Sequence, residues 1–587
     1  MAPDSRELQG FGWMNYAVFG LTLMMNTLIS VIVVCFGKKQ KTIEEYVLGG
    51  RKISFLLIAI SLVTSHVSAI TLIGVPTEVY LYGTLYWLLC PSMVIVGFLT
   101  IKIFIPVYRS LEITNLQQYL QLRFTNRVRL IGTILYTINT LLFLPILIYG
   151  PALAFSQVSG INLHIISTSV CIVCTFYTML GGLKGIVWTD GLQAFIMVCS
   201  CLTWVAMGTK NAGSIATVWE RAKEGHRLRL FEMNPSPLEA RTFWTMTLGS
   251  IGLWMANSAT NPLMVQRFLA VSSLKKTKKA MLLYTLGIIF VNSMSCYTGL
   301  IIYSLYGDCD PILTGAIEKP NQLMPYFIMD TVGHIPGLPG LFVAAIFSSA
   351  LSSLSAAMNA LSGIIYEEFI MRMFNKPARF GPTVYIKLQI IAIGILCLLL
   401  IFVVDKLGEL IELALSVNGI TSGTLLGLYT LGMTVPCANS KGAIAGVSIS
   451  LLTMSVIVGG TQISKFNKMP PFQPDVSGCT NFTLDNANFT SQWHTTDQSN
   501  TFVLFKISFV YYTLLGCLIV LAVGTITSLL TRTKGENLLN ANLIAPPFRF
   551  LLPTVSKNRD SDVKLLKTDE TTTGSFRGNG RVLLDGA

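Results

Sequence analysis

Charged residues are scarce in this sequence. Only 12% of its 587 residues are Asp, Glu, Lys or Arg, whereas 52% are apolar. Soluble domains have about 25% charged residues, so the composition excludes a soluble multidomain protein and indicates a chain that crosses a membrane many times. The net charge of +13 does not indicate a nucleic-acid partner, because the basic residues lie in short clusters between apolar stretches, where they orient membrane helices.

Several functional signatures are also missing. The sequence contains no nucleophile–base pair of an enzyme and no metal-binding motif. Cys171 and Cys174 form an isolated C-x-x-C without the second pair that zinc requires. A selectivity-filter sequence and an arginine ladder are both missing, which disfavours a channel. The polar N-terminus MAPDSRELQG lacks a basic start, so we expect no cleavable signal peptide.

The twelve cysteines lie mostly in apolar stretches, where cysteine behaves as a small buried side chain. Cys309 and Cys479 lie instead in long polar loops. They form a disulfide if both loops face an oxidising compartment, and otherwise they remain free thiols. The sequence leaves both alternatives open.

Thirteen apolar stretches are long enough to cross a bilayer as helices, since a spanning helix needs about 20 residues. They cover residues 13–36, 53–78, 83–107, 130–158, 163–180, 186–208, 243–268, 280–306, 338–366, 384–405, 407–433, 441–460 and 504–531. The sequence therefore predicts an all-α polytopic membrane protein.

Lysine and arginine in short loops predict the orientation, because such loops stay in the cytoplasm. Basic clusters follow the first, third and seventh stretches, at residues 38–52, 109–129 and 275–279. The N-terminal residues 1–12 are therefore expected outside the cell and the polar tail 532–587 inside. The long loop between the sixth and seventh stretches is also basic but is predicted outside.

The loop 461–503, between the last two spans in the region 441–531, falls outside in this topology. It contains both N-glycosylation sequons of the chain, Asn481-Phe-Thr and Asn488-Phe-Thr. Glycosylation requires an outer location, so the two sequons agree with the predicted orientation.

Two apolar stretches carry many polar residues at membrane depth. One is SLVTSHVSAITLIGVP at residues 61–76, and the other is NSATNP at residues 257–262. They lie in the second and seventh predicted spans. These would be the first helices of two five-helix repeats if the chain, after an extra first helix, consists of inverted repeats at 53–208 and 243–433. Inverted repeats of this kind contain broken helices whose free backbone groups bind ions and substrate. Alternatively, each hydroxyl bonds its own helix or joins neighbouring helices.

A third polar cluster is FSSALSSLSAAMN, residues 347–359. Its serines occupy two adjacent stripes of one helix. Hydroxyl and carbonyl oxygens suit an alkali cation better than a transition metal, although small residues also allow close helix packing.

Three ionisable residues lie within or beside apolar spans. Asp190 could cap or begin a helix on the cytoplasmic side, where a charge is less costly than at the membrane centre. Glu412 lies deeper and needs a partner, a watery cavity or a bound proton. A lone histidine such as His66 is either a hydrogen-bonded structural residue or a substrate contact.

Five segments resemble the sodium/solute symporter family, which includes sodium-coupled glucose, iodide, monocarboxylate and multivitamin transporters. In chain order they are GGLKGIVWTDGLQAFIM, VQRFLA, YGDCDP followed by QLMPYFIMD, FSSALSSLSAAMN and GITSGTLLGLYTLGM. The resemblance covers nearly the whole chain. The segment VSAITLIGVPTEVYLYGT is most similar to the monocarboxylate and multivitamin branch.

The resemblance implies a LeuT-type core with thirteen helices and a sodium site between the broken second helix and the ninth helix. The implied sodium ligands are the carbonyl groups of Thr64, Val67 and Ser349 and the hydroxyl groups of Ser352 and Ser353. Asp190 is similar to an acidic residue near the sodium exit route. The implied substrate contacts are His66, Thr71, Asn261, Glu412 and Thr421.

The sequence departs from the family in three places near the substrate. It reads TNPLMVQR where the vitamin and monocarboxylate members resemble N-Q-A-Q-V-Q-R. Glu412 stands where many relatives have glutamine, and His66 stands where sugar transporters often have asparagine. Arg267 is expected near the cytoplasmic end, so no arginine is evident for a carboxylate substrate. Sugar transport is disfavoured.

The sequence thus predicts a plasma-membrane sodium symporter that imports a small organic solute, and it favours an organic anion such as a monocarboxylate or vitamin. Sodium is the coupling ion, and no other metal or cofactor is expected. The expected partners are the solute, sodium and the lipid bilayer. One alternative is a sensor that has the same fold but does not transport, and another, because of Glu412, is a symporter for a cationic or zwitterionic solute.

Overall fold

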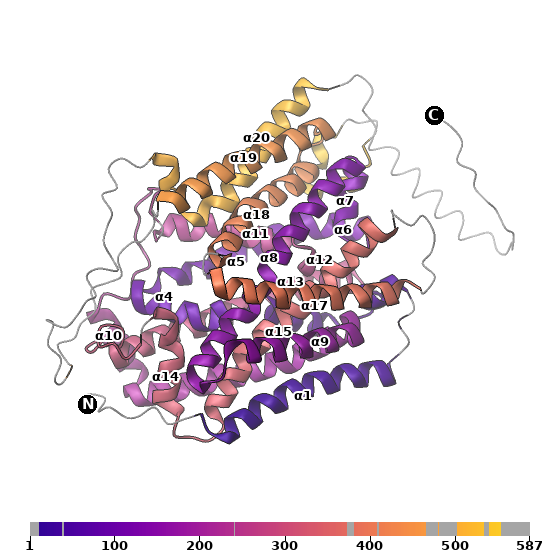
Figure 1. The fold of residues 1–587 in the computed structure, drawn as a ribbon. Coiled ribbons are helices and arrows are strands. Elements are labelled where there is room, and N and C mark those ends of the chain that lie inside the picture. Colours follow the sequence, from indigo (N-terminus) through magenta and orange to yellow (C-terminus); the bar gives the residue numbers. More distant parts are fainter. Residues whose placement is uncertain are drawn as a thin grey trace.

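Helices make up almost all of the regular structure in the computed structural model, which describes residues 11–37, 40, 42–239, 241–317, 319–371, 381–407, 410–464, 479, 502–532 and 539–552 (Figure 1). Within these ranges the only strand-like pairing is an isolated bridge between Ile53 and Val271. The all-α prediction is therefore confirmed.

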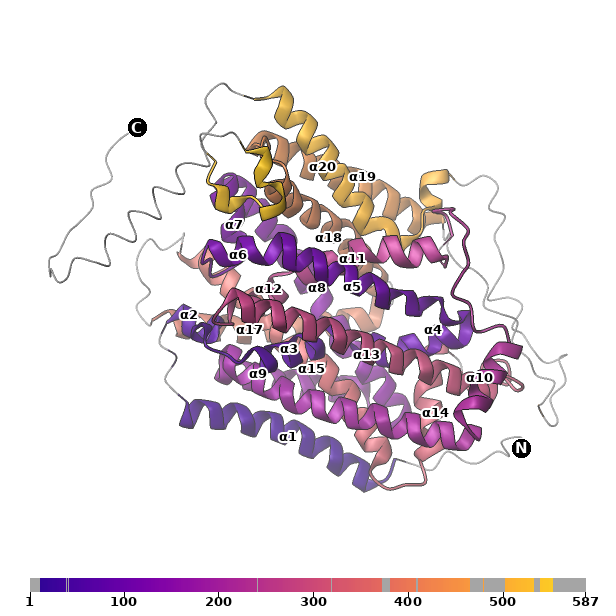
Figure 2. The same cartoon turned by 180° about the vertical axis from the view of Figure 1, so that it is seen from behind.

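The helices form a bundle with α1 at one edge and α19 and α20 at the opposite edge, in both views (Figures 1 and 2). The helices are α1 (Trp13–Phe36), α2 (Ile43–Val47), α3 (Phe55–His66), α4 (Val75–Tyr82), α5 (Leu89–Leu99), α6 (Ile105–Ser110), α7 (Gln117–Arg123), α8 (Asn126–Ser159), α9 (Leu163–Ala212), α10 (Ile215–Glu224), α11 (Ser250–Ala259), α12 (Pro262–Leu269), α13 (Leu274–Tyr306), α14 (Leu323–Val332), α15 (Leu338–Ile365), α17 (Pro382–Leu407), α18 (Leu410–Thr434), α19 (Ser440–Ser464) and α20 (Tyr512–Leu530).

The outer surface of the bundle is apolar, as expected where lipid replaces water. Leu28 of α1, Leu388 of α17 and Leu452 of α19 are all exposed. In contrast, α15 is buried on nearly every face, including all of its serines. The helix that the sequence singled out for its hydroxyl groups is thus the centre of the bundle.

The two helix breaks predicted from the polar clusters are both present. The first separates α3 from α4: the helical backbone stops at Val67 and Ser68, resumes through η2 (Ile70–Gly74), and the two halves are bent by 63°. The second separates α11 from α12 at Thr260 and Asn261. Both breaks lie inside the bundle, where other groups can satisfy the freed backbone.

The count of thirteen spans is not confirmed. Among the described residues, nine helices are long and apolar enough to cross a membrane, or ten if the bent α3–α4 pair is one span. The predicted spans 163–180 and 186–208 join as α9, whose backbone leaves the helical conformation only at Gly182 (φ 54°). The span 243–268 divides into the short helices α11 and α12, neither of which is long enough alone.

Cys309, just after α13, is joined to Cys479 by a disulfide. The sequence left the choice between this disulfide and two free thiols open. The predicted glycosylation sites Asn481 and Asn488 lie outside the described residues, as does the side chain of Glu412. The orientation of the termini stays a prediction.

Small residues bring α19 and α20 into close contact. Gly442 and Gly446, spaced as GxxxG, face α20, and a methyl group at Gly446 would lie 2.9 Å from the carbonyl oxygen of Val520. Close backbone approach through small residues is a typical way to join helices in lipid, where there is no hydrophobic driving force between them.

We expect Gly446→Val to lower the melting temperature of the purified protein in detergent, because overpacking costs about 1–3 kcal/mol. Gly459→Val in the same helix is the matched control, since nothing lies within 4 Å of a methyl group there. Equal melting temperatures for the two variants, measured by intrinsic fluorescence, would contradict this packing.

Candidate functional site

A cavity of about 220 Å³ lies against both helix breaks. Its lining comes from five parts of the chain that are distant in sequence: the α3 break, α8, the α11–α12 break, α15 and α18. Hydroxyl groups and His66 line it, together with four asparagines, which are Asn139, Asn257, Asn261 and Asn418. The described residues that line it include no Asp, Glu, Lys or Arg.

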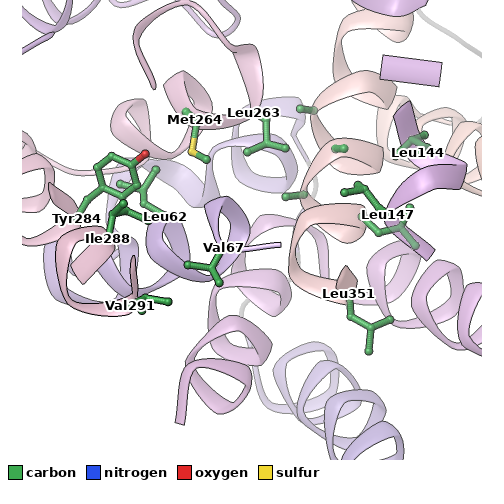
Figure 3. Close-up of a cluster of buried hydrophobic side chains, with 14 of the residues drawn as sticks. Leu62, Val67, Leu144, Leu147, Leu263, Met264, Tyr284, Ile288, Val291 and Leu351 are labelled. Atoms are coloured by element: carbon green, nitrogen blue, oxygen red, sulfur yellow. The ribbon is translucent and has the colours of Figure 1, made fainter. Parts of the chain in front are cut away.

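Apolar side chains form the remaining walls of the cavity. Figure 3 shows Leu263 and Met264 of α12 on one side and Leu147 of α8 on the other, and all three line the cavity. Neutral polar groups between apolar walls are typical of a site that binds and orients a small molecule.

The residues predicted to bind sodium lie where the α3 break meets α15. The Ser353 hydroxyl lies within hydrogen-bond distance of the carbonyl oxygens of Ser65 (3.0 Å) and Ser349 (3.1 Å), and its single proton can be donated to either one. The carbonyl oxygens of Thr64 and Val67 accept no hydrogen bond from the described residues. The structure therefore places two free backbone oxygens at the break, which is the kind of ligand that a sodium ion requires.

Ser352, the other predicted hydroxyl ligand, contacts a buried ion pair. Its hydroxyl donates to Asp190 at 2.6 Å and lies 2.6 Å from the Ser65 hydroxyl. Asp190 also accepts a hydrogen bond from Ser61 and is paired with Arg267 at 3.1 Å. Both side chains of the pair are almost completely buried.

The structure corrects one expectation about these charges. Asp190 neither caps nor begins a helix, because it lies eight residues after the Gly182 kink, inside α9. Arg267 lies in the last turn of α12, and it is buried there, where it donates hydrogen bonds to Ser61 (2.7 Å) and Ser65 (2.8 Å) and to Asp190. The break at Asn261 turns α12 so that Arg267 faces α3, and a count along one straight helix misses this.

The predicted substrate contacts are only partly brought together. His66 and Asn261 line the cavity. Thr71 and Thr421 do not appear among the lining residues, and the Thr421 hydroxyl bonds its own helix at the Val417 carbonyl (2.7 Å). Asn261 also caps α12 by accepting a hydrogen bond from the Leu263 amide (3.0 Å).

Sequence reasoning missed two lining asparagines. The Asn139 amide donates to Asn418 at 3.3 Å across α8 and α18, and Ser422 donates to Asn418 at 2.6 Å. A signal was available, since a side-chain amide inside an apolar span is costly unless it is paired or functional.

His66 is held by aromatic residues. Its ring stacks on Trp254 with centroids 4.4 Å apart, and its Nδ1 lies 2.6 Å from the Tyr284 hydroxyl. These contacts fix the orientation of the ring at the cavity wall.

A helical bundle with two broken helices that meet a buried, serine-rich helix is the architecture of LeuT-type membrane transporters. A solved structure of a Na+-coupled sialic acid symporter has the same fold, with a TM-score of 0.74 at 22% identity over 89% of this chain and 99% of that chain.

The sequence also identifies the family. The pattern of the sodium:solute symporter family matches residues 46–450, and the chain belongs to this family. Similar proteins include the sodium-coupled monocarboxylate transporter 2 of Mus musculus, 35% identical over 92% of this chain and 87% of that protein. Others are the human sodium-coupled monocarboxylate transporter 1, 34% identical over 89% and 88%, and the human sodium/iodide cotransporter, 32% identical over 92% and 87%.

Membership places the chain among multi-pass membrane transporters that use sodium as the coupling ion, and not among enzymes. This is the class that the serine cluster and the helix breaks predicted. Membership in the family does not by itself identify the residues that bind sodium or the solute.

We expect Arg267→Met to destabilise the protein strongly, because removing one partner of a buried pair leaves an uncompensated charge and costs about 3–5 kcal/mol. The purified variant should melt well below the wild type, and adding Asp190→Asn should recover part of the loss. The control is Arg229→Met, whose ion pair with Glu232 is over one-third exposed. An Arg267→Met protein as stable as the control would contradict the pairing.

Proposed function

We propose that this chain imports a small organic anion, a monocarboxylate or a vitamin, together with sodium. The observation that carries the proposal is the double position of Ser353, which lines the cavity and also donates to the Ser65 carbonyl at the helix break. A cation bound at the break would therefore lie beside a solute bound in the cavity.

The sodium site that we propose consists of the carbonyl groups of Thr64, Val67 and Ser349 and the hydroxyl groups of Ser352 and Ser353. The free carbonyl oxygens at the break support this assignment, since the carbonyl dipoles have no other partner among the described residues. The Ser353 hydroxyl can rotate, so that its proton points to a carbonyl group while a lone pair of its oxygen faces the ion.

Electrostatics favour an anionic solute. The described residues of the lining include no charged side chain, so an anion entering the cavity would have to lose hydration without a fixed counter-charge from them. Sodium at the adjacent break supplies that charge. Each ligand then raises the affinity for the other, and this reciprocal coupling is the thermodynamic basis of symport. The relatives named as monocarboxylate transporters give independent support.

Sodium also couples transport to the conformation of the protein and to the membrane potential. Bound sodium would connect the α3 break to α15, and its dissociation would remove that connection, so the ion favours the conformation with an ordered cavity. The membrane potential adds about 2.3 kcal/mol for each charge moved across 100 mV. We propose that Asp190, hydrogen-bonded to Ser352 at 2.6 Å, is the next oxygen donor on the path by which sodium leaves.

Two other functions remain as alternatives. A cationic solute would be repelled by the neighbouring sodium, and Glu412, the residue that would favour such a solute, has a side chain outside the described residues. A sensor without transport would bind sodium and solute but move neither.

Uptake in cells that express the chain distinguishes these functions. We expect sodium-dependent uptake of one or more labelled carboxylates among lactate, nicotinate, biotin and pantothenate, and none of glucose or choline. Replacing sodium by an impermeant cation should abolish the uptake. Uptake of choline alone would support the cationic alternative, and binding without uptake the sensor.

The sodium site is tested by Ser353→Ala and by the double change Ser352→Ala with Ser353→Ala. We expect the single change to raise the half-saturating sodium concentration about tenfold, which is the loss of about 1.4 kcal/mol, and the double change to abolish coupled uptake at equal surface expression. Ser362→Ala, whose hydroxyl bonds its own helix at Asn359, is the control. Unchanged sodium dependence in the double variant would exclude this site.

We also propose a plasma-membrane location with the N-terminus outside, the C-terminus in the cytoplasm and glycans at Asn481 and Asn488. We expect the glycosidase-sensitive mobility shift of the protein on a gel to disappear when both asparagines are changed to glutamine. A shift that persists in the double variant would contradict the assignment.

A further inference from the structure

A short chain of hydrogen bonds ends at His66 in the cavity wall. The Tyr284 hydroxyl lies 2.6 Å from His66 Nδ1 and 3.2 Å from the Ser258 hydroxyl. Tyr284 and Ser258 are both fully buried. Tyr284 belongs to α13 and packs beside Leu62 and Ile288 (Figure 3), so the chain joins α11, α13 and the end of α3.

The protons in this chain can be placed by requiring each buried donor to have an acceptor. The Ser258 hydroxyl has no hydrogen-bond partner other than Tyr284 among the described residues. If Tyr284 donated to Ser258, the serine proton would have no acceptor. Ser258 therefore donates to Tyr284, and the single tyrosine proton goes to His66 Nδ1. Because Nδ1 accepts, the imidazole must carry its proton on Nε2.

The Nε2–H group is the polar group of the His66 ring that is left to bind a solute in the cavity. His66 lines the cavity, its other nitrogen is bound to Tyr284, and stacking on Trp254 at an interplanar angle of 23° fixes the plane of the ring. A fixed N–H donor can bind an oxygen that accepts hydrogen bonds, such as a carboxylate oxygen, and cannot bind an ammonium group.

We propose that Ser258 and Tyr284 are positioning residues that hold His66 in the Nε2–H tautomer, so that it donates a hydrogen bond to an acceptor oxygen of the solute and makes the cavity selective for anions. This inference rests on the proposed function and deepens it. It assigns part of the choice of solute charge to a chain of residues that begins at Ser258 in α11 and ends at His66.

The first test is a double-mutant cycle on uptake of lactate, nicotinate, biotin and pantothenate. We expect Tyr284→Phe to raise KM for the transported carboxylate about tenfold, as for loss of one hydrogen bond to a charged group, while the maximal rate, and the sodium dependence measured at saturating solute, stay unchanged. In a His66→Gln background the same change should have no further effect, because Gln presents its amide without help from Tyr284.

Tyr297→Phe is the matched control, since Tyr297 lies in the same helix and bonds Thr209 instead. An equal increase in KM with and without His66 would show that Tyr284 acts only through packing and would overturn the inference. If the wild type transports none of the four carboxylates, the proposed function fails and this inference fails with it. Transport by the wild type with an unchanged KM in Tyr284→Phe overturns the inference alone.

The second test measures the tautomer directly, so it does not depend on transport. The chain has five histidines, and the solid-state NMR signals of ¹⁵N-histidine-labelled protein can be assigned to His66 by their loss in His66→Gln. We expect an unprotonated Nδ1 and a protonated Nε2 in the wild type, and a change in the Nδ1 signal in Tyr284→Phe. A protonated Nδ1 in the wild type would overturn the assignment.

Discussion

Backbone groups that leave a helix within a membrane must find partners inside the protein, because hydrocarbon offers none. This constraint explains why the breaks after α3 and α11 lie at the centre of the bundle and face α15. It also explains why the carbonyl oxygens of Thr64 and Val67, which accept no bond from the described residues, are suited to a cation. The cavity and the proposed cation site follow from the same interruption of the helix.

The buried pair of Asp190 and Arg267 contacts the end of α3 just before this interruption. Three hydroxyl groups make four hydrogen bonds with the pair: those of Ser61 and Ser65 on α3 and of Ser352 on α15. A buried pair of this kind adds little net stability compared with apolar residues of the same volume. Its geometry instead links α3, α9, α12 and α15 at one point. Movement of any of these helices during transport must therefore rearrange the pair.

Neutrality is the other main property of the cavity. Amides and hydroxyl groups can donate or accept as the solute requires, so they bind many small molecules with little preference for charge. A preference for solute charge then has to come from groups with a fixed charge or orientation. Two such groups are the proposed sodium ion and the oriented His66 ring. The first acts through charge and the second through the direction of one proton. In the proposed function, these two groups would together make the cavity selective for anions without a cationic side chain among its described lining residues.

The apolar stretches by themselves determined the all-α fold, and the polar clusters at 61–76 and 257–262 determined where its helices break, because both are local properties of the chain. The serine cluster of α15 was also evident from the sequence, and the family resemblance implied which of its serines would bind sodium. Only the tertiary structure decided that Arg267 meets Asp190, that Asn139 and Asn418 join the cavity, and that Tyr284 orients His66. These partners lie 77, 279 and 218 residues apart. Inside a bundle surrounded by lipid, the outward and inward faces are both apolar, so hydrophobic periodicity does not show which face of a helix is turned inward. That choice depends on packing between distant helices.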